Sequence, residues 1–414
     1  MESLFTQALG LAPPWSVASV DFKPAEGRID FTVDCTAQRM RCPECGAQEQ
    51  PVHDRLERTW RHLNFFQYKA FLHAQMPRVR CSSCGKTRQV DAPWSRPGSG
   101  FTILMEAFIV ALCREMPMAA VARLLGISGD RVGRVLDYHV ERARAKETYA
   151  DVTQLGVDER SVRRGQRYVT LFHDASERRV LFGVSGRKAD TFAAFAKDLT
   201  AHGGDPTAVA TVSMDMSKAY QAGARAHCPN AKLCFDPFHV VALAHDALEQ
   251  VRRAETKCEP DLKGSRWALL KDAGNWNLRQ ITLMHYLQRS TLKTARAWRL
   301  KEALRAVFAK VHAPAQAEVD LKAWISWARR SRLAPFKRLG KSLRDHLDGI
   351  LEHFRTGLSN GFVEAMNGLL KAAIARARGY GTDRRFITMA YLIGGKLKHL
   401  PANPWTALSV QTAK

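Results

Sequence analysis

The sequence predicts an α/β fold, and two features between residues 155 and 250 indicate it. Short runs rich in branched and aromatic residues lie at 155–184 and are separated by turn-forming residues such as Gly165, as expected for a meander of three strands. After them, helical segments alternate with two apolar runs, which end on Asp215 and Asp236. This order of elements is that of a ribonuclease-H-like core.

The charge of the chain narrows its partners. Lys and Arg number 63 against 40 Asp and Glu, so the formal net charge is +23 over 414 residues. A balance this basic indicates a phosphate-rich partner such as double-stranded DNA, although a solubilising surface is the plainer explanation. The apolar stretch at 103–113 is interrupted by Glu106 and is far shorter than the roughly 20 residues that span a bilayer. The first residues have no signal-peptide pattern, so we expect a cytoplasmic, nucleoid-associated protein without a membrane segment.

Two cysteine pairs predict a zinc ribbon in a DNA-binding domain at residues 1–95. Cys42 and Cys45 form one pair, Cys81 and Cys84 form the other, and a glycine follows each pair. Two residues between thiolates let both sulfurs face one ion, and two such pairs supply the four tetrahedral ligands of a structural Zn²⁺. The 35 residues between the pairs exceed the usual spacing, so a β-rich insertion is expected there.

Other uses of cysteine and histidine in this region stay open. A redox dithiol is one alternative to zinc, and His53, His62 or His73 could replace one thiolate. The remaining cysteines have no partner at ligand spacing and are expected to be small buried apolar residues. They are Cys35, Cys113, Cys228, Cys234 and Cys258.

Residues 96–150 are expected to form a helix-turn-helix DNA-binding domain. The segment 118–136 has small alanines for close packing, a glycine in the turn and Ser128 as the N-cap of a second helix. Arg131 and Arg134, three residues apart, would project from one exposed face of that helix toward a major groove. An ordinary helical hairpin with a solvated basic face is the alternative.

Three carboxylates are candidate ligands of a catalytic metal. Asp158 lies in the first strand-like run, Asp215 ends an apolar run, and Glu364 opens a helical segment. The first two converge if their strands are neighbours in the sheet, and the third must then come from a later helix packed against it. Carboxylates from different elements can hold the pair of Mg²⁺ (or Mn²⁺) ions used in phosphodiester cleavage. Each acid alone is weak evidence, because an aspartate at a strand end often caps a helix.

Asp236 is a rival of Glu364 for the third position. It ends the last strand of the core, and His239 follows one turn later. We favour Glu364, because Asn367 and Lys371 fall on the same face of its helix and present an amide and a cation beside the acid. Asp236 and His239 are then expected to support the site, with Asp236 capping the helix that His239 enters.

The long segment between the second and third acids predicts an all-helical insertion domain at residues 252–356. It is rich in Lys, Arg, Leu and Ala. We expect most of its aromatic residues to pack in a core, with one or two free to stack on a distorted base. Arg329 and Arg330 belong to a basic run that would contact phosphate or form a solvated helix face. Five of the nine tryptophans of the chain lie in this segment: Trp267, Trp276, Trp298, Trp324 and Trp327.

Taken in order, these motifs resemble the bacterial ISL-three-type insertion-sequence transposases. The resemblance implies an Asp-Asp-Glu transposase that binds terminal inverted repeats and uses Mg²⁺ to cut DNA and join it to a target, with Asp158, Asp215 and Glu364 as the catalytic acids. We expect a homodimer or higher oligomer on the DNA. One departure is the short basic run Lys86-Thr-Arg after the second cysteine pair, where the family has a fuller one. The matching motifs are the cysteine pairs, the helix-turn-helix, Leu155-Gly-Val-Asp-Glu, Val212-Ser-Met-Asp-Met, Phe235-Asp-Pro-Phe-His-Val, Ser359-Asn-Gly-Phe-Val-Glu-Ala-Met-Asn and Arg378-Gly-Tyr-Gly.

The expected order after the DNA-binding domains is therefore a first part of the catalytic core at 151–251, the insertion, and a C-terminal helical part of the core at 357–414 that carries the third acid. Two other function classes share these elements. One is a DNA-binding regulator without chemistry, against which the intact acids argue. The other is a nuclease of the same fold that only hydrolyses DNA, against which the N-terminal modules and the long insertion argue.

Overall fold

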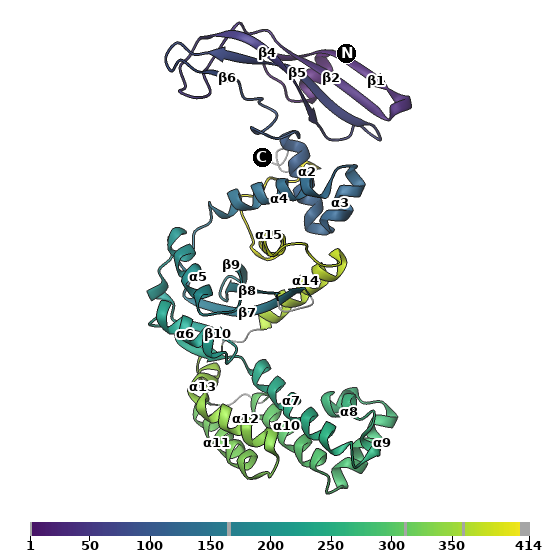
Figure 1. The fold of residues 1–414 in the computed structure, drawn as a ribbon, viewed down its shortest axis with the longest axis vertical. Coiled ribbons are helices and arrows are strands. Elements are labelled where there is room, and N and C mark those ends of the chain that lie inside the picture. The colour runs from purple at the N-terminus through teal and green to yellow at the C-terminus, as the bar shows by residue number, and fades with distance from the viewer. Residues whose placement is uncertain (1, 164–166, 310–312, 358–360, 406–414) are drawn as a thin grey trace. The chain divides into compact units, whose positions relative to one another are not determined.

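The computed structural model divides into two compact units, Met1–Arg142 with His399–Lys414 and Ala143–Lys398 (Figure 1). The turn expected at Gly165 and the motif residue Ser359 lie outside the described residues. The described residues are 2–163, 167–309, 313–357 and 361–405.

A six-stranded sheet forms much of the first unit, preceded by a short helix. These elements are α1 (Glu2–Ala8), β1 (Trp15–Lys23), β2 (Arg28–Cys35), β3 (Arg39–Met40), β4 (Gln50–Arg61), β5 (Lys69–Arg80) and β6 (Thr87–Gln89). The strand order is β1-β2-β5-β4-β3, with β6 beside β5. β4 and β5 run antiparallel and pair Leu56 with Met76, so they are the β-rich insertion expected between the cysteine pairs. Trp15 and Trp60 pack edge-on against Trp94 in the core of this sheet, with ring centroids 5.0 and 5.4 Å apart.

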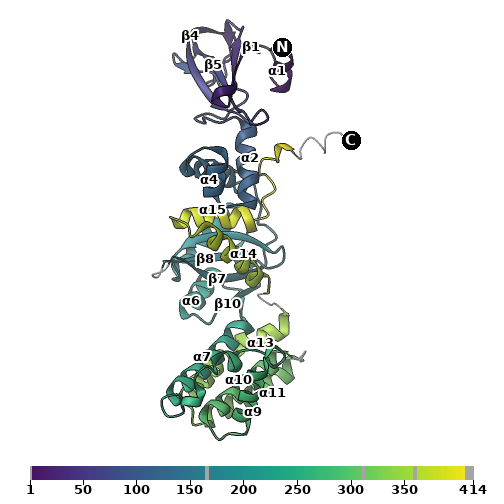
Figure 2. The same ribbon diagram turned by 90° about the vertical axis from the view of Figure 1, so that its right-hand side faces the viewer.

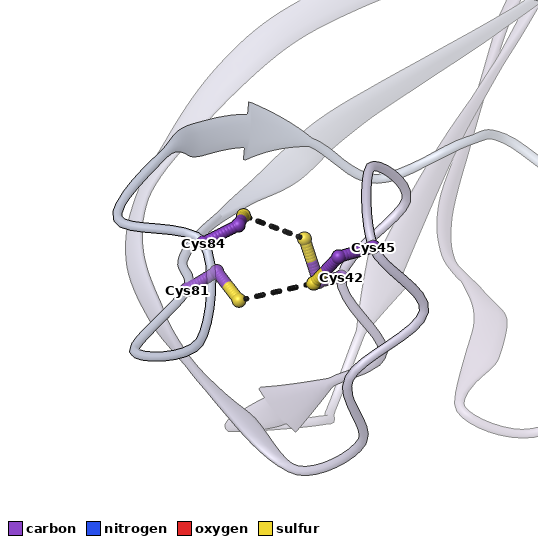
Figure 3. Close-up of side chains that lie close together, drawn as sticks. All are labelled: Cys42, Cys45, Cys81 and Cys84. Carbon is purple, nitrogen blue, oxygen red and sulfur yellow. Dashed lines mark hydrogen bonds between the residues drawn. The ribbon is translucent and has the colours of Figure 1, made fainter.

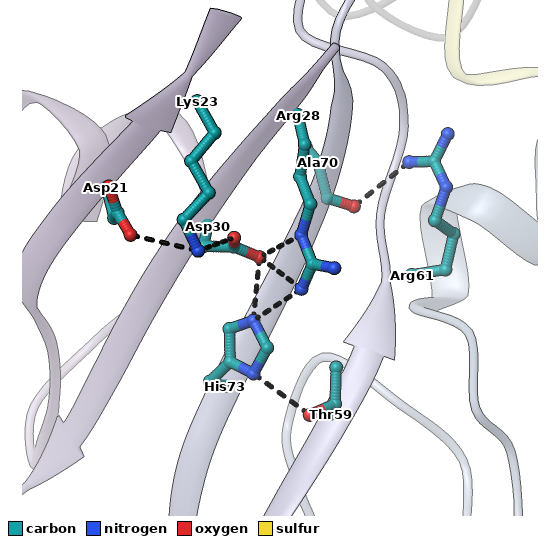
Figure 4. A network of polar contacts seen from close by, with 8 residues as sticks. All are labelled: Asp21, Lys23, Arg28, Asp30, Thr59, Arg61, Ala70 and His73. Carbon is teal, nitrogen blue, oxygen red and sulfur yellow. Dashed lines mark hydrogen bonds and ion pairs between the residues drawn. The ribbon is translucent and has the colours of Figure 1, made fainter. Parts of the chain in front are cut away.

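A buried acid links three strands of this sheet (Figure 4). Asp30 on β2 accepts hydrogen bonds from Arg28 Nε at 2.8 Å and from Lys23 at 3.3 Å, and its Oδ1 lies 2.8 Å from His73 Nε2 on β5. Burial acts to raise the pKa of Asp30, but the hydrogen bonds from Arg28, His73 and Lys23 outweigh it and lower that pKa. Asp30 is therefore held ionised by its neighbours, and its bonds link β1, β2 and β5.

Three further helices follow the sheet in the first unit. The last of them ends two residues after Arg142, the end of that unit's first segment. They are α2 (Ile103–Glu115), α3 (Met118–Leu125) and α4 (Gly129–Arg144). Gly126 ends α3 in the left-handed region, at a φ of 64°, and Ser128 Oγ accepts a hydrogen bond from Arg131 N at 3.4 Å. The buried Glu106 of α2 joins His139 of α4 at 2.7 Å and Arg96 at 2.9 Å. The turn glycine and the serine cap lie where the sequence analysis expects them.

A five-stranded sheet forms the centre of the second unit. Its strands are β7 (Gln154–Arg163), β8 (Arg167–Asp174), β9 (Arg179–Ser185), β10 (Thr211–Met214) and β11 (Lys232–Phe235). The order is β11-β10-β7-β8-β9, and β10 runs parallel to both of its neighbours. Ser213 pairs with Gly156, so the strand of Asp158 lies beside the strand that leads to Asp215, as expected.

Helices cover both faces of this sheet (Figures 1 and 2). The helices concerned are α5 (Asp190–Ala201), α6 (Lys218–His227), α14 (Gly361–Ala377) and α15 (Asp383–Gly394). Adjacent residues of β9 show the two layers, because Phe182 packs near Phe195 of α5 whereas the backbone N–H of Gly183 donates to Tyr391 Oη of α15 at 2.9 Å. α14, the helix that carries Glu364, packs against β7 and covers part of the sheet.

The segment between the core parts is helical, as expected. Its helices are α7 (Pro237–Glu255), α8 (Arg266–Leu270), α9 (Leu278–Arg289), α10 (Lys293–Ala309), α11 (Pro314–Arg330), α12 (Ala334–Asp345) and α13 (Leu347–Thr356). α7 begins at the sheet and packs against α10 and α12, while α13 packs against β11, so the insertion and the sheet share one hydrophobic core. Trp324 is buried and donates to the carbonyl of Leu300 at 2.8 Å, whereas Trp267 and Trp327 are 60% and 43% exposed. The tryptophans are thus divided between core and surface.

Candidate active site and metal centres

The four paired cysteines converge at one end of the first sheet (Figure 3). Their sulfur atoms all lie within 4.8 Å of one another, with Cys42 and Cys84 separated by 3.9 Å and Cys45 and Cys81 by 3.5 Å. Four sulfurs placed tetrahedrally about 2.3 Å from one Zn²⁺ ion are separated by about 3.8 Å, so the cluster fits the ion. Each loop closes through a backbone bond from the following glycine to the first cysteine of its pair, and Gly46 has a φ of 80°.

Two of the three histidines that could have replaced a thiolate lie elsewhere, and His53 is not in the cluster either. His62 Nδ1 lies 2.9 Å from the hydroxyl of Thr102, and His73 is held between Asp30 and Thr59, so neither belongs to the cluster. Among the remaining cysteines, Cys258 is exposed, which contradicts the expectation that all five are buried; the other four are buried. Cys258 follows the C-terminal end of α7, where the chain turns at the surface.

The three predicted acids line one pocket of about 550 Å³ in the second unit. Asp158 comes from β7, Asp215 follows β10, and Glu364 lies in the first turn of α14. The four residues that were expected to support them line the same pocket: Asp236, His239, Asn367 and Lys371. The fold thus brings together side chains that the chain separates by up to about half its length.

Asn367 joins the helix of the third acid to the strand of the first. Its Nδ2 donates to Asp158 Oδ2, and its Oδ1 accepts a hydrogen bond from Arg160 Nε at 2.9 Å. Asn367 is 9% exposed, so water competes little for these bonds. The amide therefore holds one oxygen of the Asp158 carboxylate and links α14 to β7.

Burial raises the pKa of three acids of the pocket, and neighbouring acids add to the shift for two of them. Burial raises the pKa of Asp158, although the hydrogen bond from Asn367 opposes the shift. Burial, and after it the charge of Asp236, raises the pKa of Glu364. Burial and the charge of Asp215 do the same for the pKa of Glu159. A cation in the pocket would relieve these repulsions.

Asp236 has the cap expected of it and one further property. Its Oδ1 accepts a hydrogen bond from Phe238 N at 3.1 Å and so caps α7. Its Oδ2 is buried and has no hydrogen-bond partner in the described part of the chain. An unsatisfied buried carboxylate oxygen beside other acids fits the oxygen ligands that Mg²⁺ takes. The acids are nevertheless spread more widely than the thiols, since among described residues only the cysteines bring three or more ligand atoms within 4.8 Å of one another.

Sequence reasoning missed two charged residues of the pocket. Glu159 and Arg160 follow Asp158 directly and also line it. Strand alternation places Glu159 on the opposite face from Asp158. β10 pairs with β7 only from Gln154 to Gly156, so beyond Gly156 that side of β7 is open and both acids can reach the pocket. The adjacent acids could have been recognised from the sequence, because two neighbouring carboxylates in a strand are costly unless a cation or a cationic side chain is near.

The two arginines of the helix-turn-helix differ in exposure. Arg134 is exposed on α4, as expected. Arg131 is half-buried, because its guanidinium lies 4.0 Å from the ring centroid of Phe101 and its Nη2 is 3.5 Å from the carbonyl of Gly100. The expectation that both project freely is therefore wrong for Arg131. Arg329 and Arg330, in the last turn of α11, are both exposed.

Comparison with known proteins identifies the family. A family model of the ISL3 group, described as a transposase, matches residues 155–390, which include Asp158, Asp215 and Glu364. The chain belongs to the ISL3 family of insertion-sequence transposases. A model for the helix-turn-helix domain of this transposase family matches residues 90–140, and a model for the zinc-finger of the IS204/IS1001/IS1096/IS1165 transposases matches residues 38–84.

Two curated relatives cover most of this ISL3-family chain. The transposase for insertion sequence element IS1001 of Bordetella parapertussis is 28% identical over 390 residues, which are 92% of this chain and 95% of the relative. The transposase for insertion sequence element IS1557 of Mycobacterium tuberculosis is 30% identical over 397 residues, 87% of each chain. The expected family, fold class and function as an insertion-sequence transposase are confirmed. Among the described residues, no helix combines the length and apolar character that crossing a bilayer requires.

Proposed function

We propose that this transposase binds the terminal inverted repeats of its element, cuts the DNA at their ends and joins the released 3′ hydroxyl to target DNA, with Mg²⁺ or Mn²⁺ as cofactor. The observation that carries this proposal is the gathering of Asp158, Asp215 and Glu364 in one pocket, with the unsatisfied Oδ2 of Asp236 beside them. Bound metal ions would activate the attacking oxygen and stabilise the leaving one.

The residues of the pocket divide the work between holding cations and holding the DNA. Asp158, Asp215 and Glu364 are the proposed metal ligands, and Asn367 orients Asp158 by its hydrogen bond. Lys371 lines the same pocket and is exposed, so its ammonium group can pair with a phosphate of the DNA. His239 would orient a phosphate or a water molecule there.

The first unit supplies the proposed DNA recognition. The helix-turn-helix presents Arg134 from its second helix to the major groove, and the zinc ribbon contributes contacts to the DNA backbone. Arg329 and Arg330 are proposed to contact DNA phosphates from the insertion. A homodimer or higher oligomer would hold two element ends at once.

A cleavage and joining assay tests the proposed chemistry. With DNA that carries the cognate end and Mg²⁺, the wild-type protein should release a 3′ hydroxyl and join it to a second DNA. Asp158→Asn, Asp215→Asn and Glu364→Gln should each lower both rates at least about 10²-fold while leaving end binding intact. Glu318→Gln, at a half-exposed acid of α11 that pairs with Lys322 outside the pocket, serves as the matched control.

The assay also separates the alternatives. Cut but unjoined products would indicate a nuclease that only hydrolyses, and binding without cutting would indicate a regulator. If Glu364→Gln keeps wild-type strand transfer while Asp236→Asn is inactive, Asp236 is the third metal ligand. Activity in all of these variants would refute the metal site altogether.

A further inference from the structure

A second pocket, of about 340 Å³, lies in the helical insertion between α10 and α11. α10 supplies Arg296 and Arg299, which are three residues apart and share a helix face. α11 supplies Trp327 and Arg330 at the same spacing near its C-terminal end. The complete lining is Arg296, Arg299, Leu300, Trp327, Arg330, Ser331 and Arg332.

The four arginines of this pocket have no counter-charge. None of the lining residues is acidic, and no ion pair is formed by any of the four arginines in the part of the chain that the structure describes. Arg296 makes one long bond, from Nη1 to the carbonyl of Ser331 at 3.5 Å, and its buried Nε has no partner there. Four like charges around one concavity repel one another, and a bound anion would turn that repulsion into attraction.

Arg332 shows that a side chain is kept at some conformational cost. Its φ of 61° lies in the left-handed region, where glycine is the residue that adopts the conformation most readily. Its side chain is exposed and lines the pocket. Glycine would suit this backbone better than arginine does. What the arginine adds is its guanidinium group at the pocket.

Trp327 adds an aromatic surface to the charge. It is 43% exposed, whereas Trp324, one turn earlier on the same helix, is buried and hydrogen-bonded. Guanidinium groups beside an exposed indole ring are the combination that binds nucleic acid strands, because the cations hold phosphates and the ring stacks on a base. In a paired duplex the faces of a base are covered by its neighbours, so an indole can stack only on a base that is unpaired or at an end.

We propose that this pocket binds an unpaired nucleotide of DNA, with the arginines on its phosphates and its base stacked on Trp327. The proposal rests on the proposed function in one respect, namely that the strand offered to the pocket is DNA of the element end. It refines the earlier expectation for α11, since Arg330 lines the pocket and the neighbouring Arg329 does not.

Equilibrium binding of the full chain to fluorescent DNA, without Mg²⁺ and with zinc retained, tests the pocket. The probes are a single-stranded oligonucleotide, a duplex with a short single-stranded extension, and the same duplex with blunt ends. Trp327→Ala should weaken binding to the two unpaired probes by about fivefold or more and should weaken blunt-duplex binding less, because a blunt duplex exposes base faces only at its two ends. Trp267→Ala, which removes the other exposed tryptophan of the insertion, is the matched control and should not distinguish the probes.

The arginines are tested by salt dependence. The double variant Arg299→Ala, Arg330→Ala should lower the slope of log affinity against log salt for single-stranded DNA by about 1.4, since each lost phosphate contact removes about 0.7. Arg279→Ala, at an exposed arginine of α9 that lies outside the pocket, should leave the slope unchanged. Arg332→Gly should weaken single-stranded binding without lowering the thermal stability of the protein, because glycine suits that backbone.

Three results would overturn the proposal: Trp327→Ala behaving like Trp267→Ala, the double arginine variant behaving like Arg279→Ala, or Arg332→Gly binding like wild type. Wild-type DNA binding together with lost self-association in the arginine variants would mean that the pocket receives an acidic segment of a second copy. Binding is measured without cleavage, so failure of the enzyme to cut DNA would refute the proposed chemistry alone. Wild-type binding by the pocket variants would refute the pocket alone.

Discussion

The cysteine cluster and the acidic pocket are both candidate metal sites, but they are built in opposite ways. Each pair of cysteines lies in one short loop, and the resulting sulfurs are 3.5–3.9 Å apart across the two loops. The acidic pocket is assembled from two strands and two helices, and its hydrogen bond between Asn367 and Asp158 spans 209 residues. Local loops therefore build a tight site, whereas the fold builds a wider one that a large anionic substrate can enter.

Removing zinc should have the largest effect of any change considered. Cys42→Ser should lose the metal and unfold the cysteine loops, because zinc binding in such modules contributes about 10–16 kcal/mol of folding free energy. Zinc content would be measured by elemental analysis, and the stability of the protein by thermal unfolding. Cys258→Ser, at an exposed cysteine outside the cluster, is the control. If zinc-free protein unfolded as the wild type does, zinc would not be what holds the cysteine loops in place, and the contrast with the acidic pocket would be lost.

Asn367→Ala tests how far the acidic pocket depends on its support. Loss of the amide frees the Asp158 carboxylate, and strand-transfer activity should fall about 10–100-fold, as for partners that orient metal ligands. The concentration of Mg²⁺ needed for half-maximal rate should rise, while DNA affinity stays constant. Leu369→Ala, at an exposed position of the same helix, should have wild-type values. An unchanged Mg²⁺ requirement would show that Asn367 does not act through Asp158.

The helix-turn-helix extends the contrast to a third site. Arg134→Ala should weaken binding to the cognate end by about 1–3 kcal/mol if it reads a base, with a smaller loss on unrelated DNA. Arg131→Ala should instead lower the stability of the first unit by about 0.5–1 kcal/mol, because its guanidinium packs on Phe101. Affinities on both DNAs and thermal unfolding distinguish the two. Equal losses of affinity on both DNAs would make Arg134 a phosphate contact.

The pH dependence of stability should show the smallest effect. The pKa values of Asp158 and Glu364 are raised in the folded protein, chiefly by burial. Their charged forms therefore destabilise the Mg²⁺-free fold, so the stability that protonation contributes is present at low pH and is lost as pH rises through the raised pKa values. The stability gained by Asp158→Asn should be greatest above the raised pKa of Asp158 and should shrink as the pH falls through it. A gain that does not vary with pH would contradict a raised pKa for Asp158.

How much of this structure the sequence predicts depends on the distance over which each feature is determined. The strands of the core, the cap at Ser128 and the zinc loops follow from neighbouring residues, and they lie where expected. The half-burial of Arg131 depends on Phe101, which lies outside the helix-turn-helix motif, so helical spacing cannot reveal it. The place of Glu159 at the pocket likewise depends on how little of β7 pairs with β10, which the residues around Glu159 do not reveal. The basic pocket at Trp327 needs the packing of two helices.

The contact between Asn367 and Asp158 also determines when in the life of the molecule the acidic pocket can exist. The ribosome makes the first unit's sheet and helix-turn-helix early, whereas Glu364 and Asn367 follow Asp158 by more than 200 residues. At about 5–20 residues per second, roughly 10–40 s separate the two parts of the pocket during synthesis. A chain that stops between α4 and α14 carries the cysteine loops and the helix-turn-helix but lacks the third acid. If the first unit binds element ends as proposed, such a chain would compete with the full-length transposase for them.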